Sequence, residues 1–69
     1  MRFQIDNKTF EIGNGHEIQS CFMTFTPDGD VASVNIMHAE GNWTYLVGEK
    51  GVYESGPRPV GLYELKAPS

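Results

Sequence analysis

Apolar and polar residues alternate along most of the chain with a repeat of two. This repeat is typical of β-strands that bury one face, whereas no window places apolar residues at the helical spacing i, i+3, i+4 and i+7. At most one short helical turn is expected, near residues 14–20. The alternating segments are separated by glycine- or proline-containing turns, and the expected strands are 2–5, 9–12, 17–25, 31–39, 43–47, 52–54 and 60–66.

The stretch from Cys21 to Val47 predicts three consecutive antiparallel strands joined by two tight turns. Residues 26–30 are expected to form the first turn. The φ of Pro27, fixed at about −65°, suits the first corner of a turn, and Gly29 tolerates the positive φ that a turn needs. Residues 40–43 form the second, because a Gly-Asn pair between two apolar runs is a hairpin signal. Between the turns, the more aliphatic set is expected to be buried: Ala32, Val34, Ile36 and His38.

The flanking segments extend the same pattern. Residues 2–12 predict a hairpin with Phe3, Ile5, Phe10 and Ile12 on one side, and residues 48–51 predict another turn. In the segment 17–25, Ile18 and Cys21 are out of phase, which indicates either a β-bulge near Gln19 and Ser20 or a strand covered on both faces. Residues 55–59 contain two prolines and are expected to form an exposed loop or an edge.

These strands predict a single small β domain spanning residues 1–69. Their number and spacing favour an antiparallel meander of six or seven short strands, bent into a curled sheet or a small barrel. A chain of about 60 residues buries only about 60% of its unfolded surface, so small domains need reinforcement. The single Cys21 excludes an intrachain disulfide, which leaves a well-packed sheet, a protein partner or a second copy.

One part of the chain resembles a known repeat. The sequence FTPDG at residues 25–29, then apolar alternation, then GNWTYLV at residues 41–47, resembles a blade of the TolB-type β-propeller family, whose motif runs F-S-P-D-G, strand, G-N-W-x-I-Y. The family implies a circular array of several blades. This chain contains one copy, so the resemblance implies a propeller only if many chains assemble, and no function is carried over from it.

Charge and hydropathy limit the expected binding partners and the expected location of the protein. The net charge is −4, from nine carboxylates against five Lys and Arg, which disfavours direct binding to nucleic acid or to an anionic membrane and permits a basic protein partner. There is no apolar run of membrane-spanning length and no hydrophobic signal region at the N-terminus. We expect a cytoplasmic protein.

The residues that could carry catalysis or bind metal are few. His16 lies in a glycine-rich loop, His38 falls on the core-facing phase, and Cys21 lacks the flanking signatures of cysteine enzymes. The pattern predicts a solvated loop histidine, a hydrogen-bonded structural histidine and a structural thiol. We therefore expect no enzymatic activity, no catalytic residues, no metal site and no cofactor.

Binding residues are more plentiful, and three groups are candidates. Trp43 and Tyr45, beside Tyr53, could form an exposed aromatic platform, since these residue types are enriched at interfaces, although part of the cluster must be core. Arg58, between two prolines, could pair with a carboxylate through two hydrogen bonds. Four carboxylates could complement a basic partner: Asp28, Asp30, Glu49 and Glu54.

The sequence therefore predicts a non-enzymatic protein–protein interaction module that uses a strand edge or an aromatic face and is able to form a homodimer. One version is a small acidic inhibitor, of phage or mobile-element type, that docks on a basic nucleic-acid-handling enzyme. The alternatives are a small-molecule or carbohydrate-binding β-barrel with an aromatic platform, and an accessory subunit of a larger enzyme.

Overall fold

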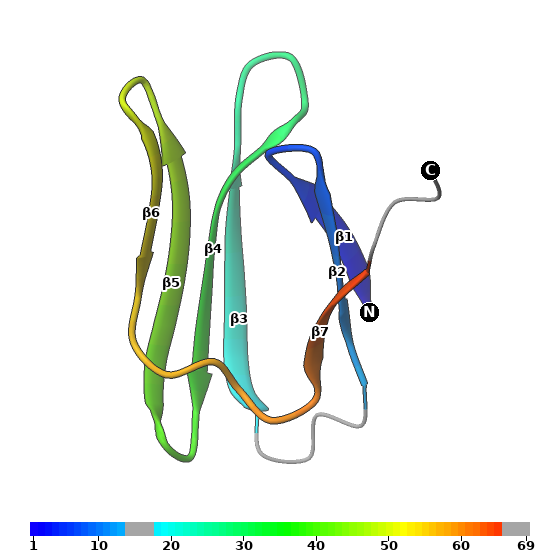
Figure 1. Cartoon of the computed structure of the whole chain (residues 1–69), viewed down its shortest axis with the longest axis vertical. Helices are drawn as coiled ribbons and strands as arrows, with labels where there is room; N and C mark the ends of the chain where they lie inside the picture. Colours follow the sequence, from blue (N-terminus) through cyan, green and yellow to red (C-terminus); the bar gives the residue numbers. More distant parts are fainter. Residues whose placement is uncertain (14–17, 66–69) are drawn as a thin grey trace.

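The computed structural model describes residues 1–13 and 18–65. These residues form seven strands in two antiparallel sheets, and the described part of the chain contains no helix able to span a membrane (Figure 1). The all-β prediction is confirmed. The strands are β1 (Arg2–Ile5), β2 (Lys8–Ile12), β3 (Ile18–Phe25), β4 (Val31–His38), β5 (Gly41–Gly48), β6 (Gly51–Ser55) and β7 (Leu62–Leu65).

The order of the strands corrects the predicted single meander. Strands β3, β4, β5 and β6 pair consecutively, but β7 pairs with β2 and leaves β6 at an edge, so the order in the second sheet is β1-β2-β7. Neither a closed barrel nor one curled sheet forms from the described strands. A two-stranded hairpin is marginally stable on its own, and β7 supplies the third strand that β1 and β2 need.

The core lies between the apolar faces of the two sheets. The Phe10 ring of β2 lies 5.4 Å from the Tyr45 ring and 6.1 Å from the Trp43 ring of β5, both edge to face. Such aromatic pairs are worth about 0.5–1.5 kcal/mol beyond their buried area. The predicted core-facing phases are confirmed; the buried apolar residues are Phe3, Ile5, Phe10, Ile12, Val34, Ile36, Trp43 and Tyr45.

Two of the three predicted turns lie where the sequence places them. In the first, Gly29 has φ of 93° and its N–H donates to the Thr26 carbonyl oxygen at 2.9 Å. The turn between β5 and β6 is also confirmed. The middle turn is formed by residues 39–40, and Gly41 pairs with His38 as the first residue of β5.

Gly41 has a different role from the predicted one. Its φ is 141°, and a Cβ at this position would approach the Pro57 ring to 3.3 Å. Glycine is therefore favoured here both by its positive φ and by the close approach of Pro57 to the start of β5.

The predicted β-bulge in β3 is confirmed. Ile18 pairs with His38 and Ser20 with Met37, so Gln19 is the extra residue. The extra residue shifts the alternation of inward- and outward-pointing side chains by one position. Ile18 and Cys21 consequently both pack against the core, and Phe22 points outward with 63% of its surface exposed.

Residues 56–61, which we call the strap, connect β6 to β7 and cross from one sheet to the other (Figure 1). The His38 ring holds the strap: its Nδ1 accepts the Glu40 N–H at 3.3 Å, so Nε2 carries the proton and donates to the Pro57 carbonyl oxygen at 2.8 Å. The Gly13 N–H donates to the Gly61 carbonyl oxygen at 2.8 Å. His38 is thus the buried, hydrogen-bonded histidine that the sequence predicts.

Candidate interaction surface

The predicted aromatic platform is corrected at two of its three residues. Trp43 is 0% and Tyr45 1% exposed, because they share a phase with Val47 that faces the other sheet. Neither side chain is accessible to a partner or to a sugar ring. Tyr53 lies on the opposite side of the same sheet and is 59% exposed, so it is separated from the other two.

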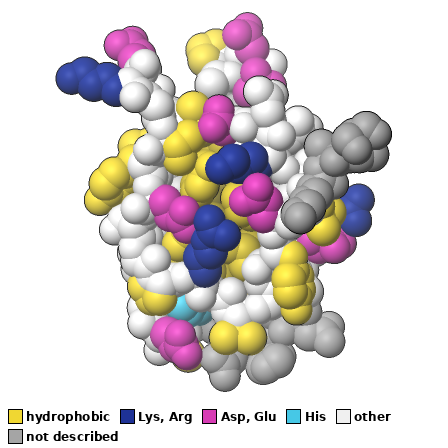
Figure 2. All heavy atoms as spheres, viewed as in Figure 1, with side chains coloured by type: hydrophobic (Ala, Val, Ile, Leu, Met, Phe, Trp, Pro, Cys, Tyr) yellow, Lys and Arg dark blue, Asp and Glu magenta, His cyan; other side chains and the backbone are white. Residues whose placement is uncertain are grey.

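Arg58 finds its carboxylate within the chain. Its Nε and Nη2 donate to the two oxygens of Glu54 at 2.6 and 3.0 Å, and the Trp43 Nε1–H donates to Glu54 Oε2 at 2.8 Å. The Arg58 guanidinium also lies 5.8 Å from the centroid of the Phe10 ring. In the view of Figure 2, basic side chains and carboxylates lie next to one another over apolar side chains in the middle of the molecule.

This arrangement gives Glu54 and Arg58 an internal role. The hydrogen bonds from Arg58, helped by that from Trp43, lower the pKa of Glu54 to about 2. Both oxygens of the carboxylate are engaged within the chain, so Glu54 and Arg58 satisfy each other in this conformation, and their predicted contact with a partner stays a prediction. The pair covers the aromatic core at the side where β6 and the strap meet.

The other three predicted carboxylates lie in exposed turns. Asp28 and Asp30 belong to the turn between β3 and β4, and Glu49 to the turn between β5 and β6. Figure 1 shows these two turns, with the turn between β1 and β2, at the same end of the molecule. The structure thus brings these residues to one end and separates them from Glu54.

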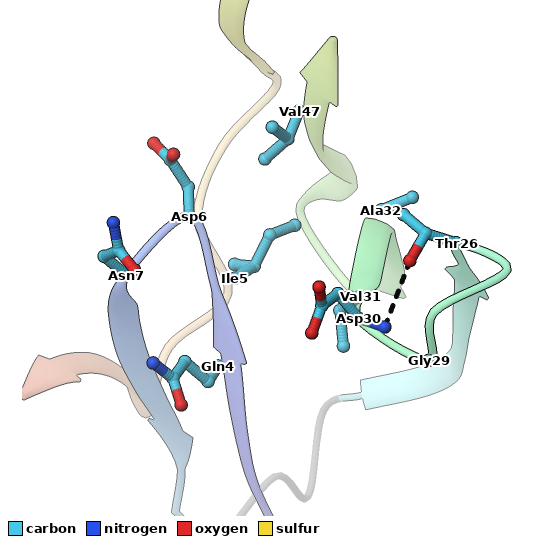
Figure 3. Close-up of a pocket in the computed structure, with 10 residues that line it drawn as sticks. All are labelled: Gln4, Ile5, Asp6, Asn7, Thr26, Gly29, Asp30, Val31, Ala32 and Val47. Carbon is cyan, nitrogen blue, oxygen red and sulfur yellow. Dashed lines mark hydrogen bonds between the residues drawn. The ribbon is translucent and has the colours of Figure 1, made fainter.

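A pocket of about 630 Å³ opens at this end (Figure 3). Apolar side chains of Ile5, Val31 and Val47 meet polar groups of Gln4 and Asp30 there. None of the residues that line it is aromatic. The stacking surface on which the carbohydrate-binding alternative relied is therefore missing from this pocket.

The outer face of the four-stranded sheet is formed by uncharged residues. Residues directly opposite one another in antiparallel strands point to the same side, so the registers define this face. Its rows run Tyr53, Leu46, Ser33, Thr24; then Ser55, Thr44, Asn35, Phe22; then Asn42, Met37, Ser20. None of these residues is charged, and we call the set the neutral face.

The neutral face combines exposed apolar side chains with polar groups that already bond to each other. Thr24 Oγ1 and Ser33 Oγ lie 2.6 Å apart, and Asn35 Nδ2 donates to Thr44 Oγ1 at 2.8 Å. Because these groups keep their partners when water is removed, covering them costs less than covering unpaired polar groups. The exposed apolar residues are Phe22, Met37, Leu46 and Tyr53, at 63%, 44%, 42% and 59%.

The outer face of the three-stranded sheet provides a contrast. Arg2 and Glu11 lie opposite each other there and form an ion pair at 3.2 Å. Tyr63 pairs with Glu11 and is 61% exposed, nearly the same as Tyr53. The two outer faces thus present similar tyrosines, one among charged residues and one among neutral residues.

The neutral face was not predicted from the sequence, because the predicted binding surface was an aromatic cluster. The signal was present in the out-of-phase residues of four neighbouring segments, 20–24, 33–37, 42–46 and 53–55, where the solvent-facing positions carry hydroxyl, amide or apolar side chains. In an antiparallel sheet with one wet face, those positions are usually polar and often charged.

Two of the candidate catalytic and metal-binding residues, Cys21 and His38, lie on the neighbouring strands β3 and β4. Cys21 is half-buried, and burial raises the pKa of its thiol. His38 is engaged at both ring nitrogens, and His16 lies outside the described residues. Within residues 1–13 and 18–65, no three His, Cys, Asp or Glu side chains are grouped to hold a metal ion.

Comparisons with protein-family models, with curated proteins and with solved structures found no match to this chain.

Proposed function

We propose that the chain is a non-enzymatic protein–protein interaction module whose docking surface is the neutral face. The observation that carries this proposal is a whole sheet face free of charge in a chain with nine carboxylates and five Lys and Arg. The centres of protein interfaces are depleted in charged residues and enriched in aromatic residues and Met, as this face is.

The same chemistry specifies the partner's surface. A charge buried against the neutral face would lose its hydration and gain no counter-charge, which is costly. The matching surface is therefore flat and uncharged, with apolar, hydroxyl or amide groups. Binding driven by apolar burial changes little between about 0.1 and about 1 M salt, although the Debye length falls from about 10 to about 3 Å.

Affinity capture with paired variants tests this proposal. Tyr53→Lys places a charge on the neutral face, and Tyr63→Lys places the same charge at an equally exposed tyrosine on the other sheet. We expect Tyr53→Lys to weaken capture of the partner about tenfold or more, the equivalent of about 1.4 kcal/mol. Tyr63→Lys should retain it, and capture should persist at high salt. Equal effects of the two substitutions would overturn the proposal.

A second candidate is the small acidic inhibitor that docks on a basic nucleic-acid-handling enzyme. It is supported by the position of Asp28, Asp30 and Glu49 at one end of the molecule. This version predicts the opposite salt dependence, because attraction between exposed charges is screened. Partner capture that is lost in high salt and in the double variant Asp28→Asn, Asp30→Asn, but unaffected by Tyr53→Lys, would favour it over the neutral face.

A further inference from the structure

Strand β3 is an edge strand that lacks charged residues and proline, and between its register shifts at Gln19 and after Thr24 it pairs regularly with β4. It pairs only with β4, so one side of its backbone has no partner strand among the described residues. Its eight residues, IQSCFMTF, include no charged residue, no proline and no glycine. An edge of this length and composition is a template for the addition of another strand.

The other three edges in the described part of the chain are protected. β6 has five residues and carries Glu54, which is tied to Arg58. β1 and β7 have four residues each and carry Arg2 and Glu64. Short edges with charged side chains resist the pairing of further strands. Among the edge strands of the described residues, only β3 is both eight residues long and free of charged side chains.

We propose that β3 pairs antiparallel with β3 of a second copy of this chain, around a two-fold axis close to Phe22. A second copy fits this edge: although each copy has a net charge of −4, two copies that meet along β3 place no charged residue of one strand against the other. The pairing is self-complementary, because the same edge serves both partners. Each chain has one such edge among its described strands, so assembly stops at the dimer.

Pairing through β3 also joins the two neutral faces into one surface. Four strands about 4.8 Å apart and about five residues long, at about 3.3 Å each, give one face a footprint of about 300 Å². A standard interface buries about 800 Å² on each partner. Two joined faces come closer to that size. This argument rests on the proposed docking function, whereas the composition and exposure of β3 do not.

Variants of the purified full chain that carry a positive or a negative charge at Phe22 test the pairing of the two β3 strands. Sedimentation analysis should find a dimer for the wild type, and at least tenfold weaker dimerisation for Phe22→Lys and for Phe22→Glu, since like charges then face each other across the axis. An equimolar mixture of the two variants should restore the dimer. Phe22 is 63% exposed, so both substitutions leave the core intact.

Tyr53→Lys is the control that separates this inference from the docking proposal. Tyr53 shares the neutral face but lies on β6, three strands from β3, so dimerisation through β3 should be unchanged. Loss of the dimer in both Phe22→Lys and Tyr53→Lys would instead indicate face-to-face stacking and overturn the edge pairing. A monomeric wild type, failure of the mixture to restore the dimer, or an open series of larger species would each overturn it as well.

Discussion

Glu54 is the residue at which three parts of the molecule meet. It lies on β6, accepts a hydrogen bond from Trp43 of the core and forms two with Arg58 of the strap. A buried indole N–H usually requires a partner, and Glu54 supplies it. The ion pair therefore couples the position of the strap to the packing of the core.

This coupling predicts a specific dependence of stability on pH. The pKa of Glu54 is lowered from 4.5 to about 2 in the folded state, so the carboxylate stabilises the fold above pH 4.5 and that contribution is lost as the pH falls towards 2. Glu54→Gln should lower the free energy of unfolding by about 1 kcal/mol at neutral pH, a modest value because Arg58 is exposed.

Urea unfolding followed by Trp43 fluorescence measures this difference across the pH range. The gap between the wild type and Glu54→Gln should close between pH 4.5 and about 2. Glu49→Gln, in an exposed turn, controls for the loss of one negative charge. A gap that stays constant down to pH 2 would show that the ion pair does not form as described.

At this scale the sequence predicted residue types better than partners. It offered Arg58 as a residue that could pair with a carboxylate of a partner protein, whereas in the structure the carboxylate is Glu54 of the same chain. The spacing of Glu54 and Arg58 carries no signal outside a helix. Their contact depends on the direction in which the chain leaves β6, which follows from Gly56 and its φ of 85°.

The strap is the element that crosses from the four-stranded sheet to the three-stranded sheet. At Gly56 it passes directly over the backbone of Asn42, and a Cβ at this position would overlap the Asn42 carbonyl oxygen. Glycine is thus required at residue 56 both for its positive φ and for the close approach of two backbones.

Gly56→Ala should therefore be far more harmful than the same change at an open turn. Gly29 has a similar φ of 93°, but an added Cβ there has nothing within 4 Å. Gly29→Ala should cost about 1–2 kcal/mol, from backbone conformation alone, and Gly56→Ala clearly more, because β5 or the strap must shift. Thermal unfolding of the two variants compares them. Equal midpoints would contradict the described path of the strap.

At the scale of elements, the local pattern of apolar residues predicted where the strands lie, whereas contacts between distant segments decided how the strands pair. The alternation of apolar residues located all seven strands and the bulge near Gln19. The pairing of β7 with β2 was missed, since a strand's own residues do not specify which free edge it joins. The predicted turn before β5 lay too far along the chain, because the Gly-Asn pair forms the first two residues of β5, where Gly41 has a positive φ and lies close to Pro57.

For the whole molecule, the distribution of charge is the feature on which the proposed function rests. Arg2 and Glu11 pair on one outer face, carboxylates collect at one end, and the other outer face has no charge. The sequence held the information for this surface, but only the registers of four strands reveal that the neutral positions are contiguous. The proposed docking function rests on this surface.

Site-specific photo-crosslinking in the cell tests that claim most directly. A photoreactive phenylalanine analogue replaces Tyr53 on the neutral face in one variant and Tyr63 on the charged outer face in the other, at sites 59% and 61% exposed. We predict a discrete crosslinked protein from position 53 and none from position 63. Equal crosslinking at both positions, or a discrete product from position 63 alone, would contradict the assignment of the neutral face as the docking surface.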